Sequence, residues 1–549
     1  MGWIAPTPPP YDPLVWRDTP FPERARMVCT AWAMQGYGTP RGVFVVYAAK
    51  IALYVGVWMA LSGLGPSSSL ADFLAPLAFQ RAIVWSLLFE VLGLGCGSGP
   101  LTGRYFPPVG GFLYFLRPGA TKLPLFPGAP LIGARTRGLL DVLLYLALVI
   151  AASRALLAPS IGASELWPLV VLVPVLGVLD KTIFLAARAE HFWVTLVCFA
   201  LTDHWIPAAM AVQLALWLWA GVSKLNPHFP TVTCVMTSNS PITFGWQRRL
   251  MYVDYPRDLR PSKLATALAH FGTLLELGVP LAFVLTPLGT PPVVAVVLML
   301  LLHVYITSNV PMGVPLEWNV IVVYGGLALF WAHPDVSVLS IDSPLLAAFL
   351  VLVLLVLPLA GNVWPARISF LLAMRYYAGN WAYSVWLFRG DSHRKLAKLT
   401  TSSGWVYDQL ARFYDRATAV GLVGKVMAFR LMHLHGRALP LLLPKALGGE
   451  PLERYEWIDG EIAAGMVLGW NFGDGHLHHE QLLAAVQAQC GFEEGELRCI
   501  FVESQPLFGH SLAYRVVDAK TGLIERGELP VAELGSRQPW QATDAAPAT

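Results

Sequence analysis

A succession of long apolar runs constrains this chain more than any other feature. Ten runs lie between residues 42 and 364, each near the roughly 20 residues with which a helix crosses about 30 Å of hydrocarbon. The run 191–225 reads as two short helices that meet near Asp203 and Pro207, so the predicted number is ten, give or take two. We expect an all-α polytopic membrane bundle of about 10 transmembrane helices. The predicted spans are 42–63, 77–96, 139–158, 165–187, 191–206, 207–225, 264–286, 291–308, 316–333 and 344–364.

The composition excludes most other classes of protein. Of 549 residues, 55% are hydrophobic and 13% are charged, against about 25% charged in soluble domains. A water-soluble enzyme, a fibrous chain and a disordered chain are therefore excluded. The net charge of +3 leaves no basic surface for nucleic acid. The six cysteines are scattered without a CxxC pair, which is typical of isolated thiols.

Changes in composition divide the chain into five parts. We expect a Pro-rich cytoplasmic segment over 1–41, the transmembrane domain over 42–364, and amphipathic membrane-associated helices over 365–449. A small soluble α+β domain follows over 450–535, with a helix in EQLLAAVQAQCGF and strands in RCIFVESQPLF and LAYRVVDAKTGLIERGELPV. Residues 536–549 are predicted to be a disordered tail.

Basic residues near the predicted spans suggest an orientation. Four arginines precede the first span, several Arg and Lys residues follow the last, and the loop 226–263 carries five more basic residues. An even number of spans with both termini cytoplasmic places all of them on the cytoplasmic side. We therefore expect an integral protein of the plasma (inner) membrane, in contact with membrane lipids. The five basic residues of the loop are Arg248, Arg249, Arg257, Arg260 and Lys263.

Ionisable residues inside the predicted spans are candidates for function, because an unpaired charge at bilayer depth is costly. Glu90 and Glu276 lie deepest, and we expect them to pair with buried cations. Asp180 and Lys181 are adjacent and either pair with each other or belong to the site. His303 is either a hydrogen-bonded core histidine or a residue of a pocket. The other ionisable residues in or beside the spans are Lys50, Asp141, Arg154, Asp203 and Lys224.

Lys224 stands out among these residues. It ends the aromatic segment QLALWLWAGVSKLNPHF (213–229), just after Ala220 and Gly221. The small residues allow another helix or a flat ligand to approach closely. Desolvation in a dry pocket disfavours the charged form of an amine, which would make Lys224 a general base. The alternative is a lysine that extends its amine to the membrane surface.

The sequence LWAGVSKLN resembles the signature of the vitamin K-dependent gamma-carboxylase superfamily, whose shared unit is called the horizontally transferred transmembrane domain. The resemblance is to a bacterial branch of this superfamily. Three further stretches follow that family's order: DKTIFLAARAEHFWVTLVCF (180–199), ALAHFGTLLELGVPLAFVL (267–285) and LLHVYITSNVPMGVPLEWNVIVV (301–323). The resemblance covers about 45–364. It implies a quinone or hydroquinone cofactor, menaquinone- or vitamin K-like, with Lys224 as the base that deprotonates it and His191 as a hydrogen-bond donor to its oxyanion. Oxygenation and proton abstraction from a substrate carbon would follow.

Two departures from that family lead to a second hypothesis. Ser223 stands where the family has a second lysine, and the family's luminal domain has no counterpart after residue 365. Carboxylation of a protein substrate is therefore not expected. The alternative to an enzyme is a scaffold, lipid-binding protein or assembly subunit that meets a protein partner in an envelope complex.

A histidine cluster in GWNFGDGHLHHEQ (469–481) is the weak candidate for a metal site. His476, His478 and His479 are close in sequence, and imidazole is a common zinc ligand. Their spacing matches no standard site, and the segment also reads as a turn followed by a helix start. We therefore predict no metal.

Overall fold

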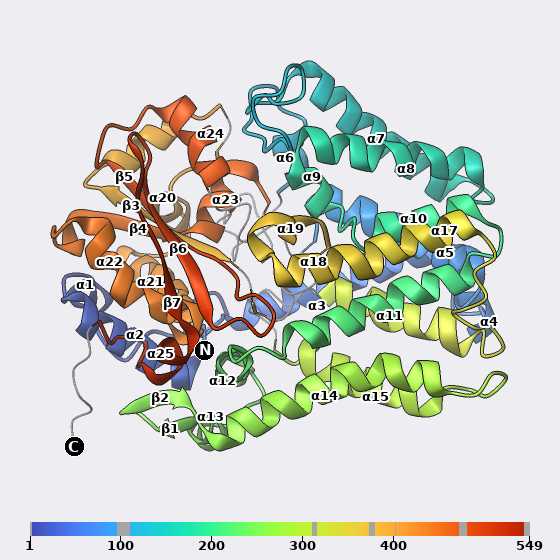
Figure 1. The fold of residues 1–549 in the computed structure, drawn as a ribbon, viewed down its shortest axis with the longest axis horizontal. Coiled ribbons are helices and arrows are strands. Elements are labelled where there is room, and N and C mark those ends of the chain that lie inside the picture. The colour runs from blue at the N-terminus through green and yellow to red at the C-terminus, as the bar shows by residue number, and fades with distance from the viewer. Residues whose placement is uncertain are drawn as a thin grey trace.

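The computed structural model describes residues 3–95, 110–309, 316–372, 379–380, 382–400, 402–470 and 480–542. A bundle of roughly parallel and antiparallel helices forms one side of the molecule, and a sheet with its own helices forms the other (Figure 1). The N-terminal helices lie with the second part and not with the bundle.

An apolar helix lies in each of the ten predicted runs, but the helices in five of the runs are too short to be counted as spans. Within the described residues five helices are long and apolar enough to cross a membrane, or six if the bent pair 416–432 and 435–447 forms one span. The number ten is therefore not confirmed. The helices are α3 (Arg41–Leu61), α5 (Pro76–Val91), α7 (Leu139–Leu157), α8 (Ala163–Leu179), α10 (Phe192–Leu201), α11 (Ile206–Ser223), α14 (Lys263–Leu285), α15 (Val293–Thr307), α16 (Leu316–Gly325) with the π-helix η2 (Gly326–Trp331), and α17 (Pro344–Val351) with the π-helix η3 (Leu352–Val356) and α18 (Leu357–Val363).

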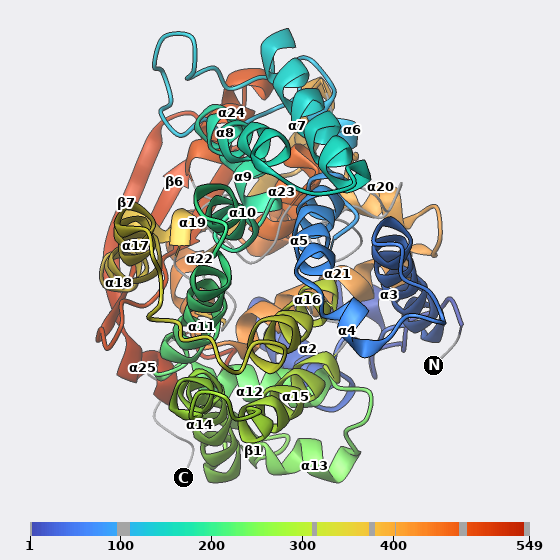
Figure 2. The same cartoon turned by 90° about the vertical axis from the view of Figure 1, so that its right-hand side faces the viewer.

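The long helices differ in how much surface they leave uncovered. Only 6% of the most apolar stretch of α3 is buried inside the protein, whereas 72% of the most apolar stretch of α11 is buried. An apolar helix with a bare surface needs a lipid environment, and a helix that is apolar all round and buried belongs to the core. The α11 helix, which carries Lys224 at its end, is thus a central helix of the bundle (Figure 2).

The connection from α11 to α14 is structured. It contains α12 (Phe229–Asn239), α13 (Gly245–Leu250) and a hairpin of β1 (Tyr252–Asp254) and β2 (Asp258–Pro261). The α14 helix then begins with Ser262 as its N-cap, whose hydroxyl accepts a hydrogen bond from the Ala265 N–H at 3.1 Å. This cap fixes where the hairpin ends and the long apolar helix starts.

The C-terminal part is a five-stranded antiparallel sheet in the order β4-β3-β5-β6-β7. The predicted helix and strands of this part are present, including the β6–β7 hairpin. The sheet is formed by β3 (Tyr383–Arg389), β4 (Tyr455–Asp459), β5 (Leu497–Val502), β6 (Ser511–Asp518) and β7 (Gly522–Pro530), and it is accompanied by α21 (Arg416–Met432), α22 (Leu439–Leu447), α23 (Gly460–Leu468) and α24 (Glu480–Cys490).

The expectation of helices throughout 365–449 is wrong for 383–389. This segment is strand β3, which pairs with both β4 and β5, so that Trp386 lies opposite Ile458 and Cys499. All but the last of its seven residues are buried. A strand covered on both faces has no alternating polar pattern, and a short apolar run of this kind is indistinguishable from a buried helix by periodicity. The sheet therefore begins well before the predicted boundary at residue 450.

The N-terminal segment is more ordered than its proline content suggests. It contains α1 (Pro13–Arg17) and α2 (Phe21–Gln35), each with a proline in its first turn, where the missing N–H costs nothing. Both helices pack against α21, and the Trp32 ring meets Phe429 of that helix. The remaining short elements are α4 (Leu70–Phe73), α6 (Phe112–Phe115), α9 (Lys181–Ala186), α19 (Pro365–Leu372), η5 (Ser392–Lys398), α20 (Val406–Leu410), η6 (His435–Ala438), η7 (Leu452–Arg454) and α25 (Val531–Ser536).

Candidate functional site

Lys224 lies at the C-terminal end of α11 and turns its amine into the bundle. Its side chain is 10% exposed and forms an ion pair with Glu276 of α14. The amine also lies 5.3 Å from the centre of the Phe229 ring. The structure thus brings together the candidate base and one of the two deep carboxylates. An amine in this position is held by a buried partner and does not extend into water.

A neighbouring helix occupies the space that Gly221 leaves open. A Cβ atom at Gly221 would lie 2.7 Å from Cδ2 of Leu277, which is on α14 beside Glu276. The absence of a side chain therefore lets α11 and α14 approach closely. The sequence allowed either another helix or a flat ligand to approach Gly221, and in the structure it is a helix, α14.

His303 is a hydrogen-bonded core residue. The Trp217 indole N–H donates to His303 Nε2 at 3.0 Å, and His303 Nδ1 lies 2.7 Å from Asn319 Oδ1. Because the Asn319 oxygen can only accept and the Trp217 N–H can only donate, His303 is the neutral tautomer that carries its proton on Nδ1.

His191 and Glu90 belong to a second buried group of charges. His191 is the N-cap of α10, and its ring centre lies 5.2 Å from that of Trp318. Glu90 accepts a hydrogen bond from the guanidinium of Arg188 at 2.8 Å, and that guanidinium lies over the Trp318 ring at 4.6 Å. His191 Nδ1 is buried and makes no hydrogen bond.

The first turn of α16 connects the two groups. Glu317 pairs with Lys50 of α3 at 2.9 Å, Trp318 meets His191, and Asn319 holds His303. Lys50–Glu317 and Arg188–Glu90 are thus two ion pairs of one acid and one base each, and Trp318, next to Glu317, lies under the Arg188 guanidinium. Sequence reasoning did not select Glu317 or Arg188, because each stands beside a predicted span end, where a charged residue is ordinary.

Asp180 and Lys181 do not pair with each other. Asp180 pairs with the buried Arg137 and accepts hydrogen bonds from the backbone N–H groups of Leu123 and Thr182 at 3.1 and 3.0 Å. The Lys181 backbone N–H donates to Leu123 at 2.7 Å. Asp180 therefore fixes the loop before α7 against the start of α9, and its role here is structural.

An apolar pocket of about 280 Å³ lies between α8, α10 and η3. Its lining includes Phe184, Trp193 and Val353, and its one charged lining residue is Glu190. The turn that carries Glu190 begins at Arg188, whose φ of +45° is unusual for a residue with a side chain. This turn places Glu190 at the pocket and the next residue, His191, against Trp318. Neither Lys224 nor His191 lines the pocket.

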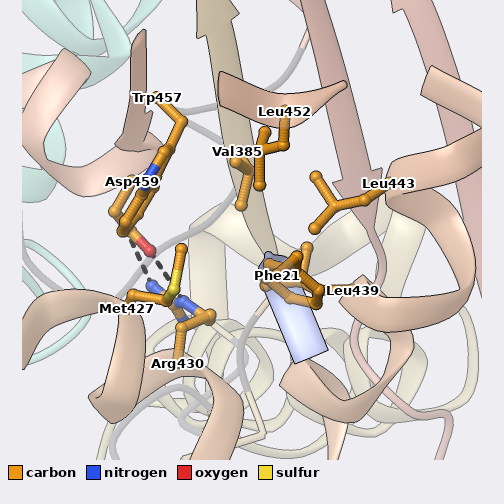
Figure 3. A pocket seen from close by; sticks show the side chains of 9 residues that line it. All are labelled: Phe21, Val385, Met427, Arg430, Leu439, Leu443, Leu452, Trp457 and Asp459. Atoms are coloured by element: carbon orange, nitrogen blue, oxygen red, sulfur yellow. Dashed lines mark hydrogen bonds and ion pairs between the residues drawn. The ribbon is translucent and has the colours of Figure 1, made fainter. Parts of the chain in front are cut away.

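Two further cavities are described. One of about 180 Å³ lies where α11 and α14 meet the loop 333–339, and Phe283, Phe330 and His333 are among its lining residues. The other lies in the C-terminal part, where Arg430 donates two hydrogen bonds to Asp459 at 2.8 and 3.0 Å (Figure 3). Its volume of about 10 Å³ is that of a single water, so Arg430 and Asp459 form a structural pair and not a ligand site.

Within the described residues no group of three or more His, Cys, Asp or Glu side chains is arranged to hold a metal ion. His476, His478 and His479 lie outside the described residues. The five described cysteines are all free and buried, and burial raises the pKa of the Cys490 thiol to about 11. That thiol is therefore protonated and unreactive at neutral pH.

Comparisons with known proteins place the chain in a family. No curated protein and no solved structure matches it, and nothing links it to the vitamin K-dependent carboxylases. One family model matches residues 1–549, the entire sequence given. The chain therefore belongs to a family of transmembrane proteins of unknown function, DUF3556.

Proposed function

We propose that this membrane protein binds a quinone or another isoprenoid lipid in the pocket between α8, α10 and η3. The observation that carries the proposal is the pocket itself, which is lined almost entirely by apolar side chains in the membrane half of the chain. Next to the lining residues on the same helices, Val175 and Val356 are exposed, so the pocket adjoins a surface that faces lipid. An apolar ligand would enter sideways from the membrane.

The pocket suits a neutral lipid with a small polar head. Phe184 and Trp193 offer flat surfaces to a ring, and the Glu190 carboxyl offers one hydrogen-bonding group to a hydroxyl. A phosphate head group would be left without a cation among these lining residues. A hydroquinone or quinone ring with its isoprenoid chain fits this combination, because a hydroquinone hydroxyl donates to the Glu190 carboxylate and a quinone carbonyl accepts from the protonated carboxyl.

Lys224 and His191 are the candidates for handling protons. A lysine paired with a buried carboxylate can pass its proton to that carboxylate and become a neutral amine, which is a competent base. His191 carries a ring nitrogen without a hydrogen bond, which suits a donor to an oxyanion. A bound hydroquinone would supply electrons to O₂ and, once oxygenated, a strong base toward a substrate carbon. Lys224 does not line the pocket, so we propose it as a base that takes the hydroquinone proton through intervening groups and not by direct contact. We also propose that both termini lie on the cytoplasmic side of the inner membrane.

Pocket-filling variants test the proposed binding. Val353→Phe places a ring inside the pocket, whereas Val351→Phe places the same ring on the exposed face of the same span. The full-length protein is purified in lipid nanodiscs and titrated with menaquinone-4, with bound quinone measured after separation. We expect binding to the unmodified protein and to Val351→Phe, and a loss of at least about tenfold in affinity for Val353→Phe, because one added ring fills much of the pocket.

The same titration distinguishes the alternative. If the unmodified protein retains no menaquinone-4, the quinone proposal is wrong and a scaffold or assembly subunit becomes the better reading. One observation favours that alternative: Lys224 is not among the residues that line the pocket. A stable protein partner that co-purifies with the chain would support it directly.

A further inference from the structure

The connection between α12 and α14 exposes an unusual number of large apolar side chains. Phe244 and Trp246 are 66% and 65% exposed, and Ile242, Leu250 and Val253 are exposed as well. These five residues, here called the 242–253 surface, lie on and around the short helix α13 and strand β1. Water is an unfavourable environment for a patch of this kind.

The cations beside the 242–253 surface point outward. Arg249, Arg257 and Lys263 are exposed, and Arg257 meets Asp254 only at 3.9 Å, with both side chains more than half exposed. The other two basic residues of the connection are engaged in the fold. Arg260 pairs with Asp258 at 2.5 Å, and Arg248 donates to backbone carbonyl groups of Met34 and Ser240. The free charge at this surface is therefore positive.

The 242–253 surface continues into a membrane helix. The α14 helix starts at Lys263, directly after β2, and its exposed residues Leu264, Leu268 and Phe271 follow one another at helical spacing on one side. Figure 1 shows α13 and the hairpin at the end of α14. An exposed apolar patch, outward cations and the start of an apolar helix thus meet at one end of the bundle.

We propose that the 242–253 surface lies on the membrane interface and binds anionic lipid head groups. Aromatic rings are favoured at the boundary between head groups and acyl chains, where Phe244 and Trp246 would insert. Arginine and lysine beside them attract anionic phosphates. Charge complementarity and the direct continuation into α14 select a lipid surface as the occupant. This surface is formed by elements other than those of the pocket, so the proposal stands independently of quinone binding.

Spin labelling of the full-length protein tests the proposal. A label at Phe244→Cys is compared with one at Lys520→Cys, an exposed position in the turn of the β6–β7 hairpin. The protein is placed in nanodiscs of phosphatidylcholine alone or with phosphatidylglycerol, and collisions with oxygen and with a water-soluble nickel complex report the depth. We expect the label at 244 to be shielded from nickel, several-fold more with phosphatidylglycerol, and the label at 520 to stay accessible to it in both.

Charge-reversal variants separate electrostatic from purely apolar contact. Arg249→Glu with Arg257→Glu is expected to abolish the dependence on phosphatidylglycerol, while Arg394→Glu, at a residue of the C-terminal part that is 75% exposed, leaves it unchanged. Equal nickel access at 244 and 520 would show that the surface faces water. Equal insertion in both lipid mixtures would show that anionic head groups are not recognised.

Discussion

Several buried charges in the membrane half of the chain form ion pairs. Lys224 pairs with Glu276, Arg188 with Glu90, and Lys122 with Asp141. Taking a single charge out of water costs several kcal/mol, and removing one partner of a buried pair typically costs about 3–5 kcal/mol. A substitution that deletes the Lys224 amine would therefore disturb the fold as well as any chemistry. A change that keeps the charge separates the two effects.

Lys224→Arg is that change. A guanidinium keeps its positive charge and can still pair with Glu276, but it does not lose a proton at neutral pH and cannot act as a base. We expect near-normal thermal stability, and menaquinol-dependent oxygen consumption lowered about 10²-fold or more, the usual contribution of general-base catalysis. Both are measured per folded protein, by thermal unfolding in detergent and with an oxygen electrode.

The matched control for this substitution is Lys122→Arg. Lys122 is also buried, with its side chain 2% exposed against 10% for Lys224, and it pairs with Asp141 at 2.6 Å. It is not among the residues that line the pocket. Lys122→Arg should therefore leave both the thermal stability and the oxygen consumption of the protein unchanged. Full activity in Lys224→Arg would exclude Lys224 as the base.

At the scale of helices, the sequence predicts positions well and lengths less well. The runs 42–63 and 264–286 are helices Arg41–Leu61 and Lys263–Leu285, because an uninterrupted apolar run has few alternatives. The run 165–187 is not one span. Its helix α8 ends at Leu179, and Asp180 caps the next helix by accepting the Thr182 N–H, so a single acidic residue in an apolar run marks a break.

The candidate site was predictable only in part, for a related reason. A carboxylate deep in the membrane needs a cation beside it, because an unpaired charge there costs free energy. Glu276 does pair with a cation, Lys224. Which cation meets Glu90 does not follow, because Arg188 lies 98 residues away along the chain. The Glu190 pocket depends on the left-handed backbone at Arg188, for which the sequence carries no glycine or asparagine as a signal.

The close packing of α11 against α14 leads to a second prediction. Gly221→Ala places a methyl group 2.7 Å from Leu277, and overpacking of this kind costs about 1–3 kcal/mol. Gly278→Ala on α14 meets no atom within 4 Å and removes a glycine from a helix interior, which is neutral to slightly stabilising. Thermal unfolding in detergent should show a lower midpoint for Gly221→Ala alone. Equal midpoints would mean that α14 moves away at no cost.

Across the whole molecule, the C-terminal part docks onto the bundle close to Lys224. Asn226, two residues after Lys224, accepts the Phe508 N–H at 2.8 Å and donates to the Pro506 carbonyl at 3.2 Å. A second contact joins the two parts where the Leu434 N–H donates to the Thr231 hydroxyl of α12 at 3.0 Å. We therefore predict that movement of the loop after β5 is coupled to the segment that holds the candidate base.

Substitution of Asn226 tests this coupling. Asn226→Ala removes the hydrogen bonds to Phe508, to Pro506 and, at 3.4 Å, to the Gln505 carbonyl. Asn226→Asp keeps the acceptor for the Phe508 N–H and loses the donor to the Pro506 and Gln505 carbonyls. Amide hydrogen exchange over 503–510 should therefore rise in the order native, Asp, Ala, because each step frees a further backbone group of this loop. The β6–β7 turn at 519–522, which has no contact with Asn226 in the structure, provides the internal reference and should exchange equally in all three proteins. The Asn380 side chain also holds this loop, because it donates to the Gln505 carbonyl at 2.8 Å and accepts from the Gln505 N–H at 2.9 Å. If exchange over 503–510 is the same in Asn226→Ala as in the native protein, Asn380 fixes the loop without the bundle. The two parts of the molecule would then move independently at this contact.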